Sequence, residues 1–107
     1  MNQGDVYWHT FKEPDKRRPV LILTRDSALP FLTSVTVASI TTNIRSIQSE
    51  VILTEDDGLI AECAISLDNI NTVPKAKLGA FITHLGPARM REVREAISFT
   101  FGFDALD

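Results

Sequence analysis

The hydrophobic residues in the first two thirds of the chain occur in short runs separated by polar and turn-forming residues. Runs of this kind, rich in Val, Ile and Thr, are typical of β-strands. The run SVTVASIT at 34–41 alternates polar and apolar residues over most of its length, which is the pattern of a half-buried strand. His9 falls in the first run and is expected on the surface of its strand. We predict strands at 6–10, 19–24, 34–41, 50–53, 63–67, 70–73 and 80–85.

The C-terminal segment follows a different, helical pattern. Gly86 suits the N-cap and Pro87 the first helical position, while Gly102 is a natural residue to end a helix. Apolar residues recur between them at spacings of three and four and predict one buried stripe, formed by Met90, Val93, Ile97 and Phe101. The solvated face is expected to carry Arg89, Arg91 and Arg94.

Many short strands followed by one helix indicate a mainly β fold with some α structure. We predict a small antiparallel barrel, partly open and capped by the C-terminal helix, as a single domain over residues 1–107. No apolar run approaches the roughly 20 residues that span a bilayer. The first residues, MNQGD, lack the features of a signal peptide. We therefore expect a cytoplasmic protein with no membrane partner.

Charge and cysteine content narrow the possible functions. The net charge of −3 argues against a non-specific coat for nucleic acid, although residues 1–50 carry six Lys or Arg against five Asp or Glu. The one Cys excludes an intrachain disulfide, and one Cys with two distant His gives no metal-ligand spacing. No Gly-rich phosphate loop or nucleophile elbow is present. We expect neither a metal ion nor a cofactor.

The most informative local feature is the step from Lys16, Arg17 and Arg18 into the apolar run that begins at Pro19. Proline has no backbone N–H, so Pro19 belongs at the start or the edge of a strand. The arginines would then be held at the mouth of a rigid strand, and a fixed guanidinium suits a phosphate group. A small basic patch of this kind fits a substrate held at a few phosphates.

Four sequence blocks then occur in order: GDVYW at 4–8, RPVLI at 18–22, VASITT at 37–42 and ISLDNINTV at 65–73. Together they resemble the MazF/PemK family of toxin endoribonucleases over nearly the whole chain. The resemblance implies an SH3-like barrel of the CcdB/MazF type, a homodimer, a cognate antitoxin, and sequence-specific, metal-independent cleavage of single-stranded RNA. In such cleavage the 2′-hydroxyl of the RNA attacks the adjacent phosphate, leaving a 2′,3′-cyclic phosphate and a 5′-hydroxyl.

The resemblance also implies roles for individual residues. Arg18 matches the arginine of the family's Arg-Pro block, and we expect it to bind the phosphate and stabilise transition-state charge. Thr41 matches an active-site threonine whose hydroxyl can donate to a phosphate oxygen. Asp68 matches a candidate catalytic base. Without the resemblance, these residues would be an ordinary strand-end cation, strand threonine and turn aspartate. Contacts to the RNA are expected from Lys16, Arg17, Thr42, Ser66 and Asn69.

The chain departs from the family pattern at three places. The first loop, 11–16, is short. Ser66 stands where some members carry an arginine that is proposed to act as the general acid, and Asn71 stands where an arginine is common. These departures keep an alternative open, a non-enzymatic interaction module. It would be a CcdB-like poison of a protein target or a decayed toxin that only binds antitoxin or RNA. The final residues, FDALD at 103–107, do not resemble the end of CcdB-type inhibitors.

Overall fold

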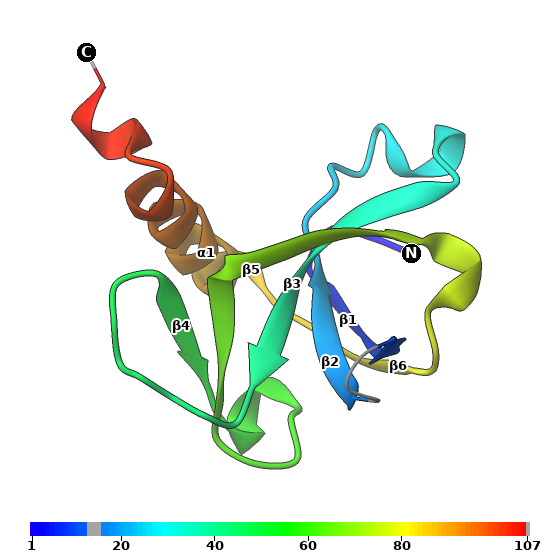
Figure 1. The fold of residues 1–107 in the computed structure, drawn as a ribbon, viewed down its shortest axis with the longest axis horizontal. Helices are drawn as coiled ribbons and strands as arrows, with labels where there is room; N and C mark the ends of the chain where they lie inside the picture. Colours follow the sequence, from blue (N-terminus) through cyan, green and yellow to red (C-terminus); the bar gives the residue numbers. More distant parts are fainter. Residues whose placement is uncertain (13–15, 107) are drawn as a thin grey trace.

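The computed structural model describes residues 1–12 and 16–106, apart from the side chain of Lys16. Its strands form one curled antiparallel sheet in the order β4-β5-β3-β2-β1-β6, and the helix α1 packs against β4 and β5 (Figure 1). The predicted mainly β, partly open barrel with a C-terminal helix is confirmed. The elements are β1 (Asp5–Phe11), β2 (Lys16–Ile22), β3 (Ser34–Thr41), β4 (Glu50–Leu53), β5 (Cys63–Pro74), β6 (Phe81–His84) and α1 (Pro87–Thr100), with 3-10 turns at Leu29–Phe31, Glu55–Asp57, Lys75–Lys77 and Phe103–Ala105.

The longest strand, β5, pairs with β3 along its length and with β4 over its first residues. Its register with β3 jumps between Ala38, which lies opposite Ile70, and Ser39, which lies opposite Ser66. Residues 67–69 therefore lie outside the ladder with β3, and the strand bends sharply, as a bulge does (Figure 1). The sequence predicted two strands, 63–67 and 70–73, on either side of this point, but the structure has one continuous strand. The number of strands was therefore predicted wrongly, although the predicted break coincides with the bulge.

Strand β2 begins earlier than predicted, at Lys16, so the three cations lie inside the strand and not at its mouth. They pair with the end of β1, where Arg18 lies opposite His9. Among the described residues, pairing with β3 begins only at Val20. Pro19 therefore lies on a locally open edge of β2, which fits a residue without a backbone N–H. Half of the predicted first loop, 11–16, falls on residues 13–15, which lie outside the described part of the chain, while Phe11 ends β1 and Lys16 begins β2.

Successive side chains point to opposite faces of the curled sheet, and each face carries its own apolar cluster. Leu21 belongs to the cluster between the sheet and α1, whereas its neighbours Val20 and Ile22 belong to the cluster on the other face. Strand β2 is thus buried on both sides over these residues. This double burial gives a rigid support to the arginines that precede them.

The helix begins at Pro87 with Gly86 as its N-cap, as predicted. Val93 and Ala96 are buried against the sheet, with partly buried side chains packed around them. Phe101, the last member of the predicted stripe, lies just beyond the helix and is 54% exposed. The buried stripe therefore ends earlier than the sequence pattern predicts.

Arg89 was predicted on the solvated face, but it binds Asp57 in the turn after β4. Its Nε and Nη2 atoms donate to the two carboxylate oxygens of Asp57, both at 3.0 Å. This fork fastens the start of α1 to the sheet. No helix in the described part of the chain is long and apolar enough to cross a membrane.

Candidate active site

A hollow of about 430 Å³ lies beside the open edge of β2, and we call it the basic hollow. Its walls come from β1 and β2, the end of β3, the turn that precedes β5, and β6. Two arginines line it, and within residues 1–12 and 16–106 no carboxylate does. The lining residues are Trp8, Arg17, Arg18, Pro19, Ile40, Thr41, Thr42, Leu59, Ile60, Ala61, Cys63 and Ile82.

Arg18 and Thr41 lie just beyond the paired part of β2 and β3, and both line the basic hollow. Val20 lies opposite Ser39 in this antiparallel pair. Arg18 and Thr41 each lie two residues beyond this last pair, so strand alternation gives them the same facing as Val20 and Ser39. Both residues are half-buried, and both line the basic hollow. The two residues that the family resemblance singles out for phosphate contact therefore share one site.

The polar side chains of Arg18, Thr41 and Thr42 in the hollow can all donate hydrogen bonds. The Thr41 hydroxyl accepts a bond of 3.1 Å from the backbone N–H of Asn43 and keeps its own proton to donate. Thr42, next in the chain, is exposed at the same site. A guanidinium and hydroxyls on one wall suit a tetrahedral phosphate and can stabilise charge that grows on its oxygens.

Arg17 lies against the ring of Trp8, with its guanidinium carbon 4.1 Å from the ring centroid. Strand alternation places Arg17 and Arg18 on opposite faces of β2. Both nevertheless line the hollow, because β3 is not paired with β2 at this point. The contact with Trp8 is a cation–π interaction that holds Arg17 in place. Lys16 begins the same strand, but its side chain is not among those described.

Three predicted site residues lie outside the lining of the basic hollow, at or near the bulge of β5. Ser66 is only 1% exposed, and its hydroxyl accepts a bond of 2.9 Å from the side-chain amide of Asn69. The carboxylate of Asp68 accepts a hydrogen bond from the hydroxyl of Ser49. These residues form a polar group of their own, separate from the set around Arg18 and Thr41.

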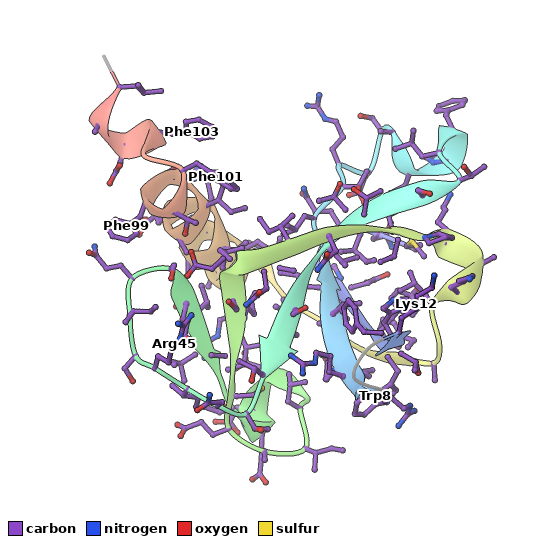
Figure 2. The ribbon with its side chains drawn as sticks, viewed as in Figure 1. Trp8, Lys12, Arg45, Phe99, Phe101 and Phe103 are labelled. Carbon is purple, nitrogen blue, oxygen red and sulfur yellow. The ribbon has the colours of Figure 1, made fainter. Side chains whose placement is uncertain are left out.

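Arg45 is a cation for which no role was predicted from the sequence. The side chain of Glu50, 1% exposed, accepts the backbone N–H groups of Arg45 and Ser46 at 3.0 Å and so fixes the loop after β3. The guanidinium of Arg45 lies 3.6 Å from Glu50 and 3.7 Å from Asp68. Figure 2 shows Arg45 and Trp8 on opposite sides of the end of β3. An Arg and a Glu five residues apart in a polar loop are too common a pattern to reveal this arrangement.

His9 was predicted on the strand surface, but it is buried. Its ring packs edge-on against Phe11, with 4.6 Å between ring centroids. The Nδ1 atom has no hydrogen-bond partner among the described residues. Burial follows from the second apolar cluster, which covers this face of β1 and which no local pattern predicts.

The remaining reactive group of the hollow is Cys63. Burial raises the pKa of its thiol, and the nearby charges of Asp57 and Glu62 raise it further. The thiol therefore stays protonated at neutral pH and is a poor nucleophile. Across the described ranges, no group of three or more His, Cys, Asp or Glu is arranged to hold a metal ion.

Comparisons with known proteins agree with this picture. The family described as PemK-like, MazF-like toxin of type II toxin-antitoxin system matches residues 2–101. Endoribonuclease MazF3 of Mycobacterium tuberculosis is 43% identical over 90 residues, covering 84% of this chain and 87% of that protein. The structure of the Mycobacterium tuberculosis toxin MazF-mt6 is 39% identical with a TM-score of 0.84, covering 92% of this chain and 96% of that one. A mycobacterial endoribonuclease in complex with its cognate antitoxin is 25% identical, also with a TM-score of 0.84, covering 95% of each chain.

The matches extend over nearly the whole chain, and their coverage includes the strands that carry Arg18 and Thr41. The resemblance read from four short sequence blocks is thereby confirmed. The homologues are MazF endoribonucleases, which places the chain in an enzyme family. This chain therefore belongs to the PemK-like, MazF-like toxin family of type II toxin–antitoxin systems.

Proposed function

We propose that this protein is a toxin endoribonuclease that cuts single-stranded RNA, mRNA in particular, at specific sequences and without a metal ion. The observation that carries the proposal is that Arg18 and Thr41 line the same basic hollow. These are two donors on a rigid strand pair, in a family whose named relatives are endoribonucleases.

In the proposed reaction the RNA supplies its own nucleophile. The 2′-oxygen forms a bond to phosphorus, and the bond from phosphorus to the 5′-oxygen breaks. The proton of the 2′-hydroxyl passes to a base, and the departing 5′-oxygen takes up a proton. The products are a 2′,3′-cyclic phosphate and a 5′-hydroxyl. Arg18 and Thr41 bind the non-bridging oxygens, whose charge increases in the transition state.

Asp68 is the proposed base, a role that comes from the family resemblance. Its side chain is 45% exposed but does not line the hollow, so the role requires the reacting 2′-hydroxyl to lie toward the bulge of β5, within hydrogen-bond reach of this carboxylate. It is held by Ser49 and lies near Arg45, so its position is defined. The role predicts that Asp68→Asn removes the acidic limb of the pH–rate profile. An unchanged profile would assign the proton transfer to another group.

The proposal includes three statements about the toxin's surroundings. The protein acts in the cytoplasm as a homodimer and is inhibited by a cognate antitoxin. The antitoxin part is supported by the mycobacterial endoribonuclease that was solved with its cognate antitoxin. An antitoxin segment rich in Asp and Glu would be attracted to Arg17 and Arg18 in place of RNA phosphates, and this binding would weaken with added salt.

The direct experiment is incubation of the purified protein with a long RNA in excess EDTA, followed by mapping of the cut sites and of both new ends. We expect discrete cuts with cyclic phosphate and 5′-hydroxyl ends. Arg18→Ala should lower the cleavage rate by about 10²- to 10³-fold, the effect of losing one donor to transition-state charge.

The matched control is Arg25→Ala, because Arg25 is an exposed arginine that does not line the hollow. This variant should cut RNA at the wild-type rate. RNA that stays intact at high protein concentration would refute the mechanism and favour the non-enzymatic alternative. Cleavage by Arg18→Ala at the wild-type rate would also refute the mechanism.

A further inference from the structure

We propose that the basic hollow is a base-binding subsite, which holds one unpaired nucleobase of the RNA beside the phosphate bound by Arg18. The inference rests on the proposed function, since it takes RNA as the substrate. It goes further by assigning the choice of cutting sequence at one position to named residues. The residues that decide it are Trp8, Arg17 and Ile60.

The volume and the lining of the hollow are suited to a flat apolar group. Its volume of about 430 Å³ lies in the range of small-ligand pockets. Pro19, Ile40, Leu59 and Ile82 supply apolar wall, and Trp8 supplies an aromatic surface. A nucleobase is flat, with two weakly polar faces, and single-stranded RNA presents such faces unpaired.

The pair of Trp8 and Arg17 provides a stacking platform. Bases in single-stranded RNA stack on aromatic rings and on guanidinium planes. Here both kinds of surface are already in contact, at 4.1 Å, on one wall of the hollow. The positive charge of Arg17 is also available to the phosphate that flanks the stacked base. This wall can therefore bind both the base and the phosphate of one nucleotide.

Ile60 lies on the turn before β5 and is 80% exposed although it lines the hollow. A large apolar side chain left in water beside a pocket becomes buried when a flat ligand enters. The hydroxyls of Thr41 and Thr42 line the same hollow and both donate and accept hydrogen bonds. They can therefore read the mixed donors and acceptors on a base edge.

An acidic peptide, such as an antitoxin segment, is the competing occupant. Carboxylates accept hydrogen bonds and would use the two arginines, but they match neither the Trp8 surface nor the accepting side of the hydroxyls. The hollow also contains Arg18, so a base whose phosphate rests on Arg18 lies within reach of it. The described contacts therefore favour the base.

The experiment uses Trp8 as its own reporter, because it is the only tryptophan in the chain. The probe is a single-stranded RNA containing a mapped cut site, made non-cleavable by a 2′-deoxy sugar at the reacting nucleotide. We expect this oligonucleotide to quench Trp8 fluorescence. A series of oligonucleotides, each with one abasic position, should lose the quenching at one position adjacent to the cut. Binding should weaken there by about 5- to 150-fold, the range for one stacked base.

Site selection is tested with Ile60→Ser and the matched control Phe31→Ser, both of which replace an exposed large apolar residue. Phe31 lies in the 3-10 turn that precedes the start of β3, whereas the hollow is lined by Ile40 and Thr41 at the end of that strand. In cut-site mapping on a long RNA, Ile60→Ser should lose the base preference at the same position that the abasic series identifies. Phe31→Ser should keep the wild-type preference.

The inference is overturned if all abasic positions quench Trp8 alike, or if Ile60→Ser cuts with the wild-type preference. It is also overturned if an acidic peptide quenches Trp8 while the intact oligonucleotide does not. These outcomes are separate from failure of the proposed function, which shows itself as no cleavage by the wild-type protein or as cleavage that does not depend on Arg18.

Discussion

Arg17 and Arg18 are adjacent in the chain, yet strand alternation sends them to opposite faces of β2. Arg18 shares its strand face with Val20 and lines the basic hollow together with Thr41. Arg17 lies against Trp8. The tasks that we propose for these two identical side chains therefore differ: phosphate binding for Arg18, and base stacking with electrostatic steering for Arg17. The difference comes from one step along a strand.

At Thr41, the proposed donor role can be separated from the role of its bulk. We expect Thr41→Val, which keeps the shape but removes the hydroxyl, to lower single-turnover cleavage by about 10- to 100-fold. Thr41→Ser keeps the hydroxyl and should stay close to wild type. Equal rates for the two variants would show that the hydroxyl plays no part.

Arg45 gives a prediction about binding. Its guanidinium lies between Glu50 and Asp68 and remains 54% exposed, so it can exchange a carboxylate for an RNA phosphate. We expect Arg45→Gln to weaken binding of the non-cleavable RNA and to reduce the slope of log K against log salt by about 0.7, one phosphate contact. Arg94→Gln on the exposed face of α1 is the control. A slope shared by both variants would exclude Arg45 from the RNA contacts.

At the scale of elements, the candidate site depends on where strands stop pairing. Strand β2 begins at Lys16, but its pairing with β3 begins only at Val20. The basic hollow lies beside this unpaired part of β2. Strand β5 bends at its bulge and carries Asp68 and Asn69 away from the hollow. Each feature adds or removes only a few ladder pairs. Together they decide which polar residues share a site.

The attachment of α1 to the sheet yields a stability prediction with a defined pH dependence. The two hydrogen bonds from Arg89 lower the pKa of Asp57 below its usual value. The ion pair therefore stabilises the fold fully above the unfolded-state pKa, near 4, and this contribution is lost as pH falls through the lowered folded-state pKa.

We expect Asp57→Asn to reduce the free energy of unfolding by about 1–3 kcal/mol at pH 7. The gap to wild type should narrow below about pH 4, as measured by urea denaturation. Asp56→Asn is the control, because the adjacent Asp56 carboxylate is exposed. A gap that stays constant from pH 7 to pH 3 would show that charge is not the cause.

At the scale of the whole molecule, the most conspicuous surface is aromatic and lies at the C-terminal end. Phe101 and Phe103 stack with ring centroids 5.8 Å apart, and both are more than half exposed (Figure 2). A contiguous apolar surface of this kind is costly to leave in water. In the proposed homodimer, we expect this surface to be covered by the second copy.

Sedimentation at micromolar concentration should therefore give the mass of two chains, twice 11.9 kDa. The double variant Phe101→Ser, Phe103→Ser should shift the protein toward the monomer. Phe31→Ser, which removes an 85% exposed phenylalanine elsewhere on the surface, should stay dimeric. A wild-type monomer, or a double variant that stays fully dimeric, would contradict this assignment.

The sequence by itself was sufficient for the approximate positions of most strands, for the start of the helix and for the family. Alternation at 34–41, the Gly86–Pro87 start of α1 and the four ordered blocks are local patterns, and local backbone preferences and side-chain spacing determine them. The family resemblance carried by these blocks singled out Arg18 and Thr41 as candidate site residues. Only the tertiary structure decided how the residues are grouped. It buried His9, paired Arg89 with Asp57, brought Arg45 to Asp68 and placed Trp8 against Arg17. Strand register and the length of unpaired edges control these contacts between distant segments, and no local pattern encodes them.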